Sequence, residues 1–348
     1  MGSRMPAALS YLWSNPAAGY VRPASTPFSA PTIARLVGAL NVGLSGRFHI
    51  VKRRVEDDSI VEAREFPNLI TDAGLNRWGS GGVIDRCMVG NGNTTPTASD
   101  VSLVSRVATS TTVQNPTTTF AFSAVDRWQE YSVGYRFAAG AATGTLAEVG
   151  VGWSDTGLWS RALIRDTSGN PTSLTLLADE YLDVFYTIRL QYPSTDVTGT
   201  VVLGGTNYAW AMRPIVLSNN TRFGYMFGGA FCSYVDGVGA SAGCYAEAYS
   251  GDLVATSNTY PTGKLSTNST TTTVAPYVDG AATGVYARDL EFTFNASGAV
   301  GSLKTAVFLL YRAYSVFQTG WQCAFTPAIP KTNTQTLKLT LRVSWARA

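Results

Sequence analysis

Charged residues are scarce in this chain of 348 residues, where they make up 14% against roughly 25% in an ordinary soluble domain. Thr, Ser, Gly, Asn and Ala take their place. Long amphipathic helices are disfavoured by this mixture, whereas Thr and Val fit a pleated sheet and Gly and Asn supply tight turns. The composition therefore predicts an all-β fold. A surface so poor in charge also favours a protein that buries much of it against other chains, with a solvated Thr- and Ser-rich face as the simpler alternative.

Histidine occurs once, as His49 in a predicted strand. A zinc site with two histidines is therefore excluded, and a Ser-His-Asp or Cys-His site would have to be built on this one residue. A Walker loop is absent, and Gly90-Asn91-Gly92 lacks the third glycine and the strand–helix unit of a dinucleotide-binding loop. We expect no catalytic residue, no metal site and no bound cofactor, and we predict that the chain is not an enzyme.

No strong excess of one charge is present, since the net charge is +3 and the isoelectric point is near 8.6. The densest basic stretch, 52–54, runs directly into the acidic stretch 56–58. Opposite charges side by side are typical of a solvated hairpin tip and not of a phosphate-binding strip. The charge pattern therefore predicts no nucleic-acid partner.

Long apolar runs are also missing. None reaches the ~18 residues that a membrane-spanning helix needs, and the most apolar stretch, 306–317, is interrupted by Arg312. We therefore predict no membrane partner. The N-terminal residues lack the sustained apolar segment of a signal peptide, so we expect no signal peptide.

Four cysteines occur, Cys87, Cys232, Cys244 and Cys323, and their spacing matches no CxxC metal-ligand pair. Cys232 and Cys244 flank a Gly-rich loop and could form a disulfide. Free, buried thiols are the favoured alternative if the protein assembles in a reducing cytosol.

Residues 1–45 are rich in Pro, Ala and Ser, and prolines at this density prevent a regular helix or a central strand. The segment also holds more aromatic residues than a merely flexible tail would. We interpret it as an extended N-terminal arm whose rings pack on the protein's own core or on a neighbouring subunit. The predicted interface residues are Tyr11, Trp13, Tyr20 and Phe28.

Strand patterns begin after residue 46. Residues 47–51 and 59–63 alternate on either side of the charged tip and predict a hairpin. In the following segment, 66–75, Asn68 or Thr71 could cap a short helix. The Asn- and Gly-rich residues 91–96 predict a turn.

An internal repeat follows from two pairs of alternating segments. Aligning Phe137 with Phe294 gives an offset of 157 (294 − 137), and aligning Ile188 with Leu341 gives an offset of 153 (341 − 188). The repeat predicts two tandem β-sandwich units, residues 46–200 and 201–348, after the N-terminal arm. The alternative is a chance similarity, because any two β-meanders share the alternation.

Two groups of residues could act on or bind a carbohydrate. Asp179, Glu180 and Asp183 could supply paired carboxylates for glycosidic-bond hydrolysis, and Asp179 with Asp183 could bind calcium. A charged loop that leads into a strand, with Asp179 and Asp183 on one face and Glu180 on the other, is the simpler account. Exposed aromatic rings could stack on a sugar, although packing in the core is commoner. The candidates for glycan contact are Trp153, Trp159 and Tyr208.

Several short segments follow one another in a defined order. The first is Asn68-Leu69-Ile70-Thr71-Asp72-Ala73-Gly74-Leu75, and the second is Gly90-Asn91-Gly92-Asn93-Thr94-Thr95-Pro96. Asp100 to Leu103, Trp159 to Ile164, Gly169 with Pro171, Leu177 to Val184 and the ending Leu341 to Arg347 complete the series. Together they resemble a module of tailed-bacteriophage structural proteins, in which an N-L-I-T-x-x-G-L segment precedes a G-x-G-N-T-x-P turn.

This resemblance implies a structural role in a virion, in the collar, tail, baseplate or a fibre, and it implies no catalytic residues. We therefore expect a component of a tailed-phage particle that is assembled in the host cytoplasm and has itself and other phage structural proteins as partners. A receptor-binding tail fibre or tip that contacts a host surface glycan is the alternative. A depolymerase that uses Asp179, Glu180 or Asp183 is a further alternative.

Overall fold

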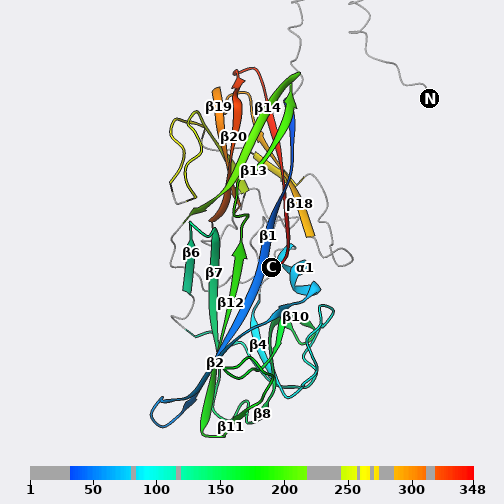
Figure 1. Ribbon diagram of the computed structural model, residues 1–348, viewed down its shortest axis with the longest axis vertical. Helices are drawn as coiled ribbons and strands as arrows, with labels where there is room; N and C mark the ends of the chain where they lie inside the picture. Colours follow the sequence, from blue (N-terminus) through cyan, green and yellow to red (C-terminus); the bar gives the residue numbers. More distant parts are fainter. Residues whose placement is uncertain are drawn as a thin grey trace, which may run out of the picture. The chain divides into compact units, whose positions relative to one another are not determined.

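The computed structural model describes residues 32–79, 84–114, 119–217, 244–256, 259–266, 270–273, 286–310 and 318–348. The chain divides into two units, residues 1–30 and 31–348, and every described residue belongs to the second. The all-β prediction is confirmed, since strands dominate the described residues and the one helix among them is α1 (Asp72–Gly79) (Figure 1). The predicted interface residues Tyr11, Trp13, Tyr20 and Phe28 lie outside the described residues.

The strands form one large sheet and three smaller ones. In spatial order, the large sheet contains β17 (Thr270–Thr273), β18 (Tyr286–Phe294), β21 (Leu337–Arg347), β1 (Thr32–Arg54), β12 (Glu180–Gln191), β7 (Trp128–Phe137) and β6 (Thr119–Ser123), and β2 (Ile60–Pro67) also pairs with β1.

A five-stranded sheet has the order β3 (Leu69–Ile70), β10 (Gly157–Leu163), β9 (Glu148–Ser154), β4 (Arg86–Gly90) and β5 (Arg106–Ser110). A six-stranded sheet has the order β13 (Val197–Leu203), β14 (Thr206–Leu217), β20 (Gln318–Lys331), β19 (Gly301–Leu310), β15 (Cys244–Tyr249) and β16 (Lys264–Ser266). The fourth sheet pairs β11 (Leu174–Leu176) with β8 (Gly144–Leu146).

The strand order repeats within the chain. The run β3-β10-β9-β4-β5 has the same connectivity as β14-β20-β19-β15-β16, and β6-β7-β12 has the same connectivity as β17-β18-β21. Every antiparallel pair of the first set therefore has an antiparallel counterpart in the second. The sets fall on either side of residue 200, where the sequence predicted the boundary. A shared topology of eight strands favours the duplication over a chance likeness of two meanders.

β1 joins the two sets into one sheet. It pairs antiparallel with β12 on one side and parallel with β21 on the other, so that it lies at the centre of the sheet (Figure 1). This arrangement is what an approximate two-fold axis through β1, perpendicular to the sheet, would produce. Two units that share a sheet differ from the two separate successive domains that the sequence suggested.

The assignment of residues 1–45 to an arm is too long. β1 begins at Thr32, directly after the last proline of the N-terminal segment, Pro31. No proline interrupts β1, so each of its residues can donate a backbone N–H to the ladder, and the strand is free to occupy a central position.

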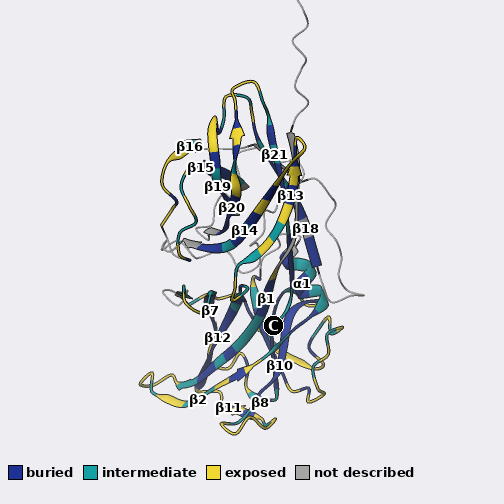
Figure 2. Ribbon diagram, turned by 45° about the horizontal axis from the view of Figure 1, so that its top comes forward, coloured by how far each residue is buried: buried dark blue, intermediate teal, exposed yellow. Residues whose placement is uncertain are grey.

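The predicted hairpin is confirmed, because β1 and β2 pair antiparallel with Val51 opposite Ala63. The predicted short helix is confirmed as α1, and the Oγ1 of Thr71 accepts a hydrogen bond from the Gly74 backbone N–H at 2.9 Å. Thr71 is therefore its N-cap. Figure 2 shows exposed residues concentrated in the loops and at the tip between β1 and β2.

The register of the repeat needs a correction of two residues. Phe137 lies opposite Leu182, and Phe294 lies opposite Leu337. If Phe137 and Phe294 are equivalent, then the offset between β12 and β21 is 155 (337 − 182) and not 153. A shift of two residues leaves every side chain on the same face, so the pattern alone could not detect it.

Alternation decides which face of the large sheet is buried. Along β12, Leu182, Val184, Tyr186, Ile188 and Leu190 are all buried, and the intervening side chains lie on the opposite face. One hydrophobic core continues through both sets of strands. The five-stranded sheet packs on this face through Trp159, whose Nε1 donates to the Tyr186 hydroxyl at 2.9 Å. The six-stranded sheet packs on it through Phe308, whose ring lies 4.9 Å from that of Phe292.

Candidate functional site

Three of the segments that carry the resemblance, 68–75, 159–164 and 341–347, meet around α1. The Thr71 backbone N–H donates to the Trp159 carbonyl at 2.9 Å, so the segment 68–75 contacts β10, which contains most of the segment 159–164. The C-terminal strand joins them, because Trp345 Nε1 donates to the Leu75 carbonyl at 3.0 Å. Segments that are far apart in the sequence therefore form one contiguous structure.

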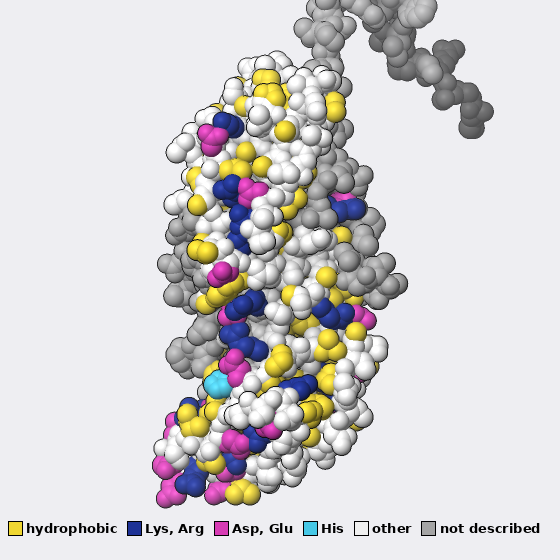
Figure 3. All heavy atoms as spheres, in the orientation of Figure 1, with side chains coloured by type: hydrophobic (Ala, Val, Ile, Leu, Met, Phe, Trp, Pro, Cys, Tyr) yellow, Lys and Arg dark blue, Asp and Glu magenta, His cyan; other side chains and the backbone are white. Residues whose placement is uncertain are grey.

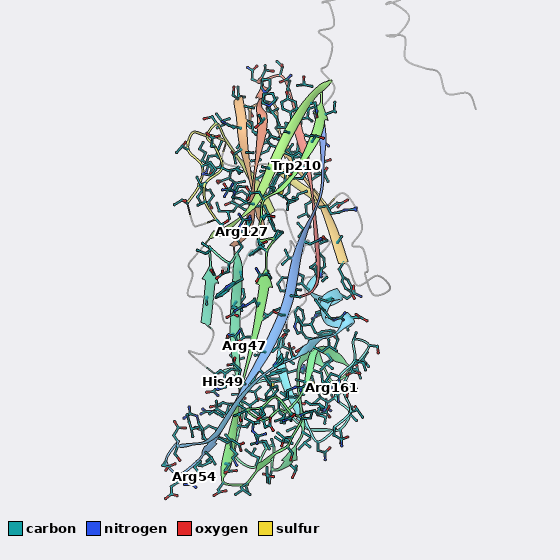
Figure 4. All side chains as sticks on the ribbon, in the orientation of Figure 1. Arg47, His49, Arg54, Arg127, Arg161 and Trp210 are labelled. Atoms are coloured by element: carbon teal, nitrogen blue, oxygen red, sulfur yellow. The ribbon has the colours of Figure 1, made fainter. Side chains whose placement is uncertain are left out.

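Arg161 lies at the centre of this structure, on β10, and its side chain is almost fully buried (Figure 4). Its Nε donates to Glu148 Oε2 at 2.7 Å, and its Nη1 donates to Asp100 Oδ2 at 2.7 Å. Its Nη2 donates to the Thr94 carbonyl at 2.9 Å. The guanidinium therefore connects β9 with two positions, Thr94 and Asp100, of the loop 91–105.

The Glu148 side chain binds the backbone of the same loop. The carboxylate is completely buried and accepts hydrogen bonds from the backbone N–H groups of Gly92 at 3.1 Å, Val104 at 3.1 Å and Ser105 at 2.8 Å. A Cβ atom at Gly92 would lie 2.4 Å from Glu148 Oε1, which explains the second glycine of the turn motif. Each charge of the buried pair is thus satisfied by several partners, as a buried ion pair requires.

Asp100 completes the network at its edge. Burial acts to raise the pKa of this carboxyl group, but hydrogen bonds from Thr97 and Arg161 outweigh it and hold the pKa below its ordinary value. Asp100 is therefore ionised near neutral pH, and its carboxylate provides a second negative charge for the Arg161 guanidinium through Nη1.

The loop presents apolar side chains to solvent. Val101 is 53% exposed and Val104 is 54% exposed, and Val107 on the adjoining β5 is 42% exposed. Because Arg161 and Glu148 fix the loop backbone, these valines are held outward in a defined arrangement. Val101 and Val104 lie on one loop with a fixed backbone, which makes them candidates for contact with another molecule.

The predicted glycan contacts do not form a common exposed surface. Trp159 is completely buried and Tyr208 is 5% exposed, so the prediction of an exposed ring is wrong for both. Their strands β10 and β14 turn these residues towards the core, which alternation alone does not reveal. Trp153 is half-buried, and its ring lies 4.8 Å beneath the Arg77 guanidinium carbon.

The predicted carboxylate cluster is dispersed. Asp183 and Glu180 are buried on opposite faces of β12, as the alternation predicted, whereas Asp179 is exposed. Arg136 forms a bidentate pair with Asp183 at 2.7 Å for both bonds, and Glu180 accepts from the Leu177 backbone N–H at 2.8 Å. Their charges are engaged in structural contacts, so neither a paired catalytic site nor the proposed calcium pair is formed.

The remaining candidates for chemistry occupy structural positions. His49 is half-buried and its ring stacks on that of Phe185 at 5.6 Å. Cys87 and Cys323 are free and buried, and burial raises the pKa of both thiols. Cys232 lies outside the described residues, so the pairing of Cys232 with Cys244 stays a prediction.

Within the described parts of the chain, no three His, Cys, Asp or Glu residues cluster as metal ligands. In the same parts, no helix is long and apolar enough to cross a membrane.

The Arg161 network was missed at the level of the sequence. A signal was present, because Arg161 interrupts the apolar run Leu158 to Leu163, and a buried arginine needs a carboxylate partner. The partner could not be identified in this way, since Glu148 and Asp100 become neighbours only when β9, β10 and the loop 91–105 come together.

No protein-family model, no curated protein and no solved structure matches this chain. Its function is therefore inferred from its own residues.

Proposed function

We propose that this protein is a non-enzymatic structural component of a tailed-bacteriophage particle, which assembles with copies of itself and docks on other virion proteins. The observation that carries the proposal is the loop 91–105, whose backbone is fixed by the buried Arg161–Glu148 pair while its valines face solvent. The same loop contains the turn that resembles the tailed-phage module.

The physical argument rests on the cost of ordering a surface. A flexible loop loses conformational entropy when it binds, whereas a loop that is already fixed loses little. A protein whose role is to dock repeatedly on identical neighbours gains affinity from such a preorganised surface. The low charge of the chain is consistent with this role, because charged residues are depleted at the centre of protein interfaces.

The experiment that tests this proposal is the solution mass of the purified chain, measured by light scattering across a concentration series. We expect a mass that exceeds the monomer and rises with concentration or on addition of particle proteins. Val101→Ser with Val104→Ser should shift the mass towards the monomer. Val125→Ser is the matched control, since Val125 is 91% exposed but lies in the turn between β6 and β7.

A chain that stays monomeric at every concentration, and that associates with no isolated particle component, would contradict the proposal. An equal effect of the control substitution would show that the loop 91–105 is not the docking surface. A stable trimer that binds a host glycan would favour the alternative of a receptor-binding fibre or tip.

A further inference from the structure

β2 is an edge strand of the large sheet. It pairs with β1 on one side, and no described strand pairs with its other edge. The unpaired edge of a sheet presents backbone N–H and C=O groups to which another extended strand can add. Figure 1 shows the β1–β2 hairpin extending from the lower end of the large sheet, and acidic and basic side chains lie intermixed around that end in Figure 3.

Alternate residues of β2 direct their backbone groups to the open edge. The Asn68 backbone N–H donates to the Gly46 carbonyl at 3.2 Å, at the end of the ladder between β1 and β2. Successive residues of a strand direct their N–H and C=O groups to opposite sides, so the even-numbered residues of this stretch face β1 as Asn68 does. Ala63 and Glu65 therefore direct theirs to the open edge.

The face of β2 that turns towards the core carries one acidic and one basic residue. Glu62 and Arg64 share this face with the buried Phe66, and they lie on either side of Ala63 in the sequence. Arg64 Nε donates to Glu62 Oε1 at 2.6 Å, and Arg64 Nη1 donates to the Ser173 carbonyl at 3.3 Å. The Glu62 side chain is 35% exposed. The two charges are thus held on one face, one residue to each side of Ala63.

This spacing is self-complementary in an antiparallel pair of identical strands. A two-fold axis at Ala63, perpendicular to the sheet, places Glu62 opposite the second copy's Arg64 and Arg64 opposite its Glu62. Opposite charges at facing positions stabilise a strand pair, and like charges destabilise it. A centre at residue 62 brings two glutamates face to face, and a centre at residue 64 brings two arginines face to face. The charges therefore favour the register centred on Ala63.

The same contact would cover apolar side chains at the hairpin end of β2. Ile60 is 57% exposed and Val61 is 40% exposed. In the register centred on Ala63 they lie opposite the second copy's Phe66 and Glu65, respectively. Removal of apolar surface from water would then add to the backbone hydrogen bonds and the charge pairs.

We propose that a second copy of this chain pairs with the open edge of β2, antiparallel and centred on Ala63, so that the large sheets of the two molecules join into one. The proposal adds a defined self-contact to the proposed assembly, but it rests on the edge of β2 and not on the virion role or on the loop 91–105. A contact about a two-fold axis closes on itself, so it yields dimers.

The charges favour a second copy over an unrelated strand as the occupant. Backbone groups alone would accept any extended segment, and charged residues on an edge commonly prevent such pairing. In β2 the charges oppose pairing in the neighbouring registers and complement each other in the register centred on Ala63, which only the same sequence supplies twice.

Disulfide trapping tests the register. In the proposed pair the two Ala63 Cα atoms are about 5.5 Å apart, which is within the range that a disulfide spans. We expect the full chain with Ala63→Cys to form a covalent dimer under mild oxidation at least tenfold faster than the parent chain, whose four cysteines set the background. The measurement is the dimer band on a non-reducing gel.

Val61→Cys is the matched control, because Val61 is exposed on the same face of β2 as Ala63. In the proposed register the two copies of residue 61 are four residues apart along the strands, about 13 Å at about 3.3 Å per residue. This separation is too long for a disulfide, so the control should link no faster than the parent chain.

Charge reversal tests the identity of the partner. Glu62→Arg and Arg64→Glu, each alone, place like charges opposite each other in a pair of identical strands. Each should weaken dimerisation at least tenfold in sedimentation velocity, and an equimolar mixture of the two variants should recover the dimer because every facing pair is again opposite in charge. Urea midpoints check that each variant is folded, and the cysteine variants, which alter no charge, keep the test decisive if one is not.

The proposal is overturned if Ala63→Cys links no faster than Val61→Cys, or if the mixture of charge variants does not recover the dimer. Self-association without the disulfide at position 63 would reject pairing through β2 and leave the proposed function standing. A linked dimer that docks on no particle component would support the pairing and contradict the virion role. An Ala63→Cys chain that links only to particle proteins would identify a different strand as the occupant and reject the second copy.

Discussion

Arg161 is the residue on which the loop 91–105 depends. A guanidinium in the interior is expensive to desolvate, and this one is retained because Glu148, Asp100 and a backbone carbonyl surround it. Removal of the arginine leaves Glu148 as a buried carboxylate without its charged partner. The loss in the free energy of unfolding is then larger than the net contribution of the ion pair, because the remaining carboxylate is buried and cannot be hydrated.

We predict that Arg161→Met lowers the free energy of unfolding by about 3–5 kcal/mol. Urea denaturation followed by tryptophan fluorescence measures the change. The double substitution Arg161→Met with Glu148→Met should cost much less than the sum of the two single changes, since it removes both charges together. Additive losses would show that the two residues do not act as a pair.

α1 is an element whose position is set by its first turn. Its N-cap Thr71 is completely buried, accepts from the Gly74 N–H and donates to the Leu158 carbonyl at 2.5 Å. Gly74 itself lies so close to β10 that an added Cβ would be 2.3 Å from the Trp159 carbonyl oxygen. The motif N-L-I-T-x-x-G-L is therefore the sequence of a helix start that packs directly on a neighbouring strand.

We predict that Thr71→Val lowers the free energy of unfolding by about 1–3 kcal/mol, because the valine keeps the volume but loses both hydrogen bonds. Thr71→Ser keeps the hydroxyl group and should cost clearly less. The measurement is the urea midpoint of each variant. Equal losses in the two variants would mean that the methyl group, and not the hydroxyl, stabilises the site.

At the scale of the whole molecule, β1 is the strand that both repeated sets use. Its first residues pair with β21, from Thr32 opposite Leu337 to Leu44 opposite Arg347, and its later residues pair with β12 and β2. A strand at the centre of a sheet satisfies hydrogen bonds on both of its edges. The N-terminal segment therefore contributes to the fold well before residue 45.

We predict that deletion of residues 1–30 leaves a cooperatively folded chain, whereas deletion of residues 1–40 removes part of β1 and destabilises it. Differential scanning calorimetry should show a single transition near that of the parent chain for the shorter deletion. For the longer deletion it should show a lowered or divided transition. A stable, unchanged transition after deletion of residues 1–40 would mean that the pairing of β1 with β21 contributes little. If the chain without residues 1–30 folds normally but no longer assembles, this result would support a role of the arm in docking.

The sequence by itself determined the all-β fold, the β1–β2 hairpin and a capped helix start at Asn68 or Thr71. These features depend on residues that are neighbours in the chain, since alternation, turn chemistry and capping act over a few positions. The faces of β12 were also predictable, with Asp183 on one side and Glu180 on the other.

Only the tertiary structure decided which faces are buried and which strands are neighbours. It buried Trp159 and Tyr208, placed β1 between β12 and β21, and brought Arg47, Arg189 and Glu130 together from three strands. The physical reason is that alternation assigns side chains to one of two faces but carries no information about the partner of a strand. Partners are selected by the burial and pairing of residues far apart in the chain, and the fixed backbone of the loop 91–105 depends on such partners.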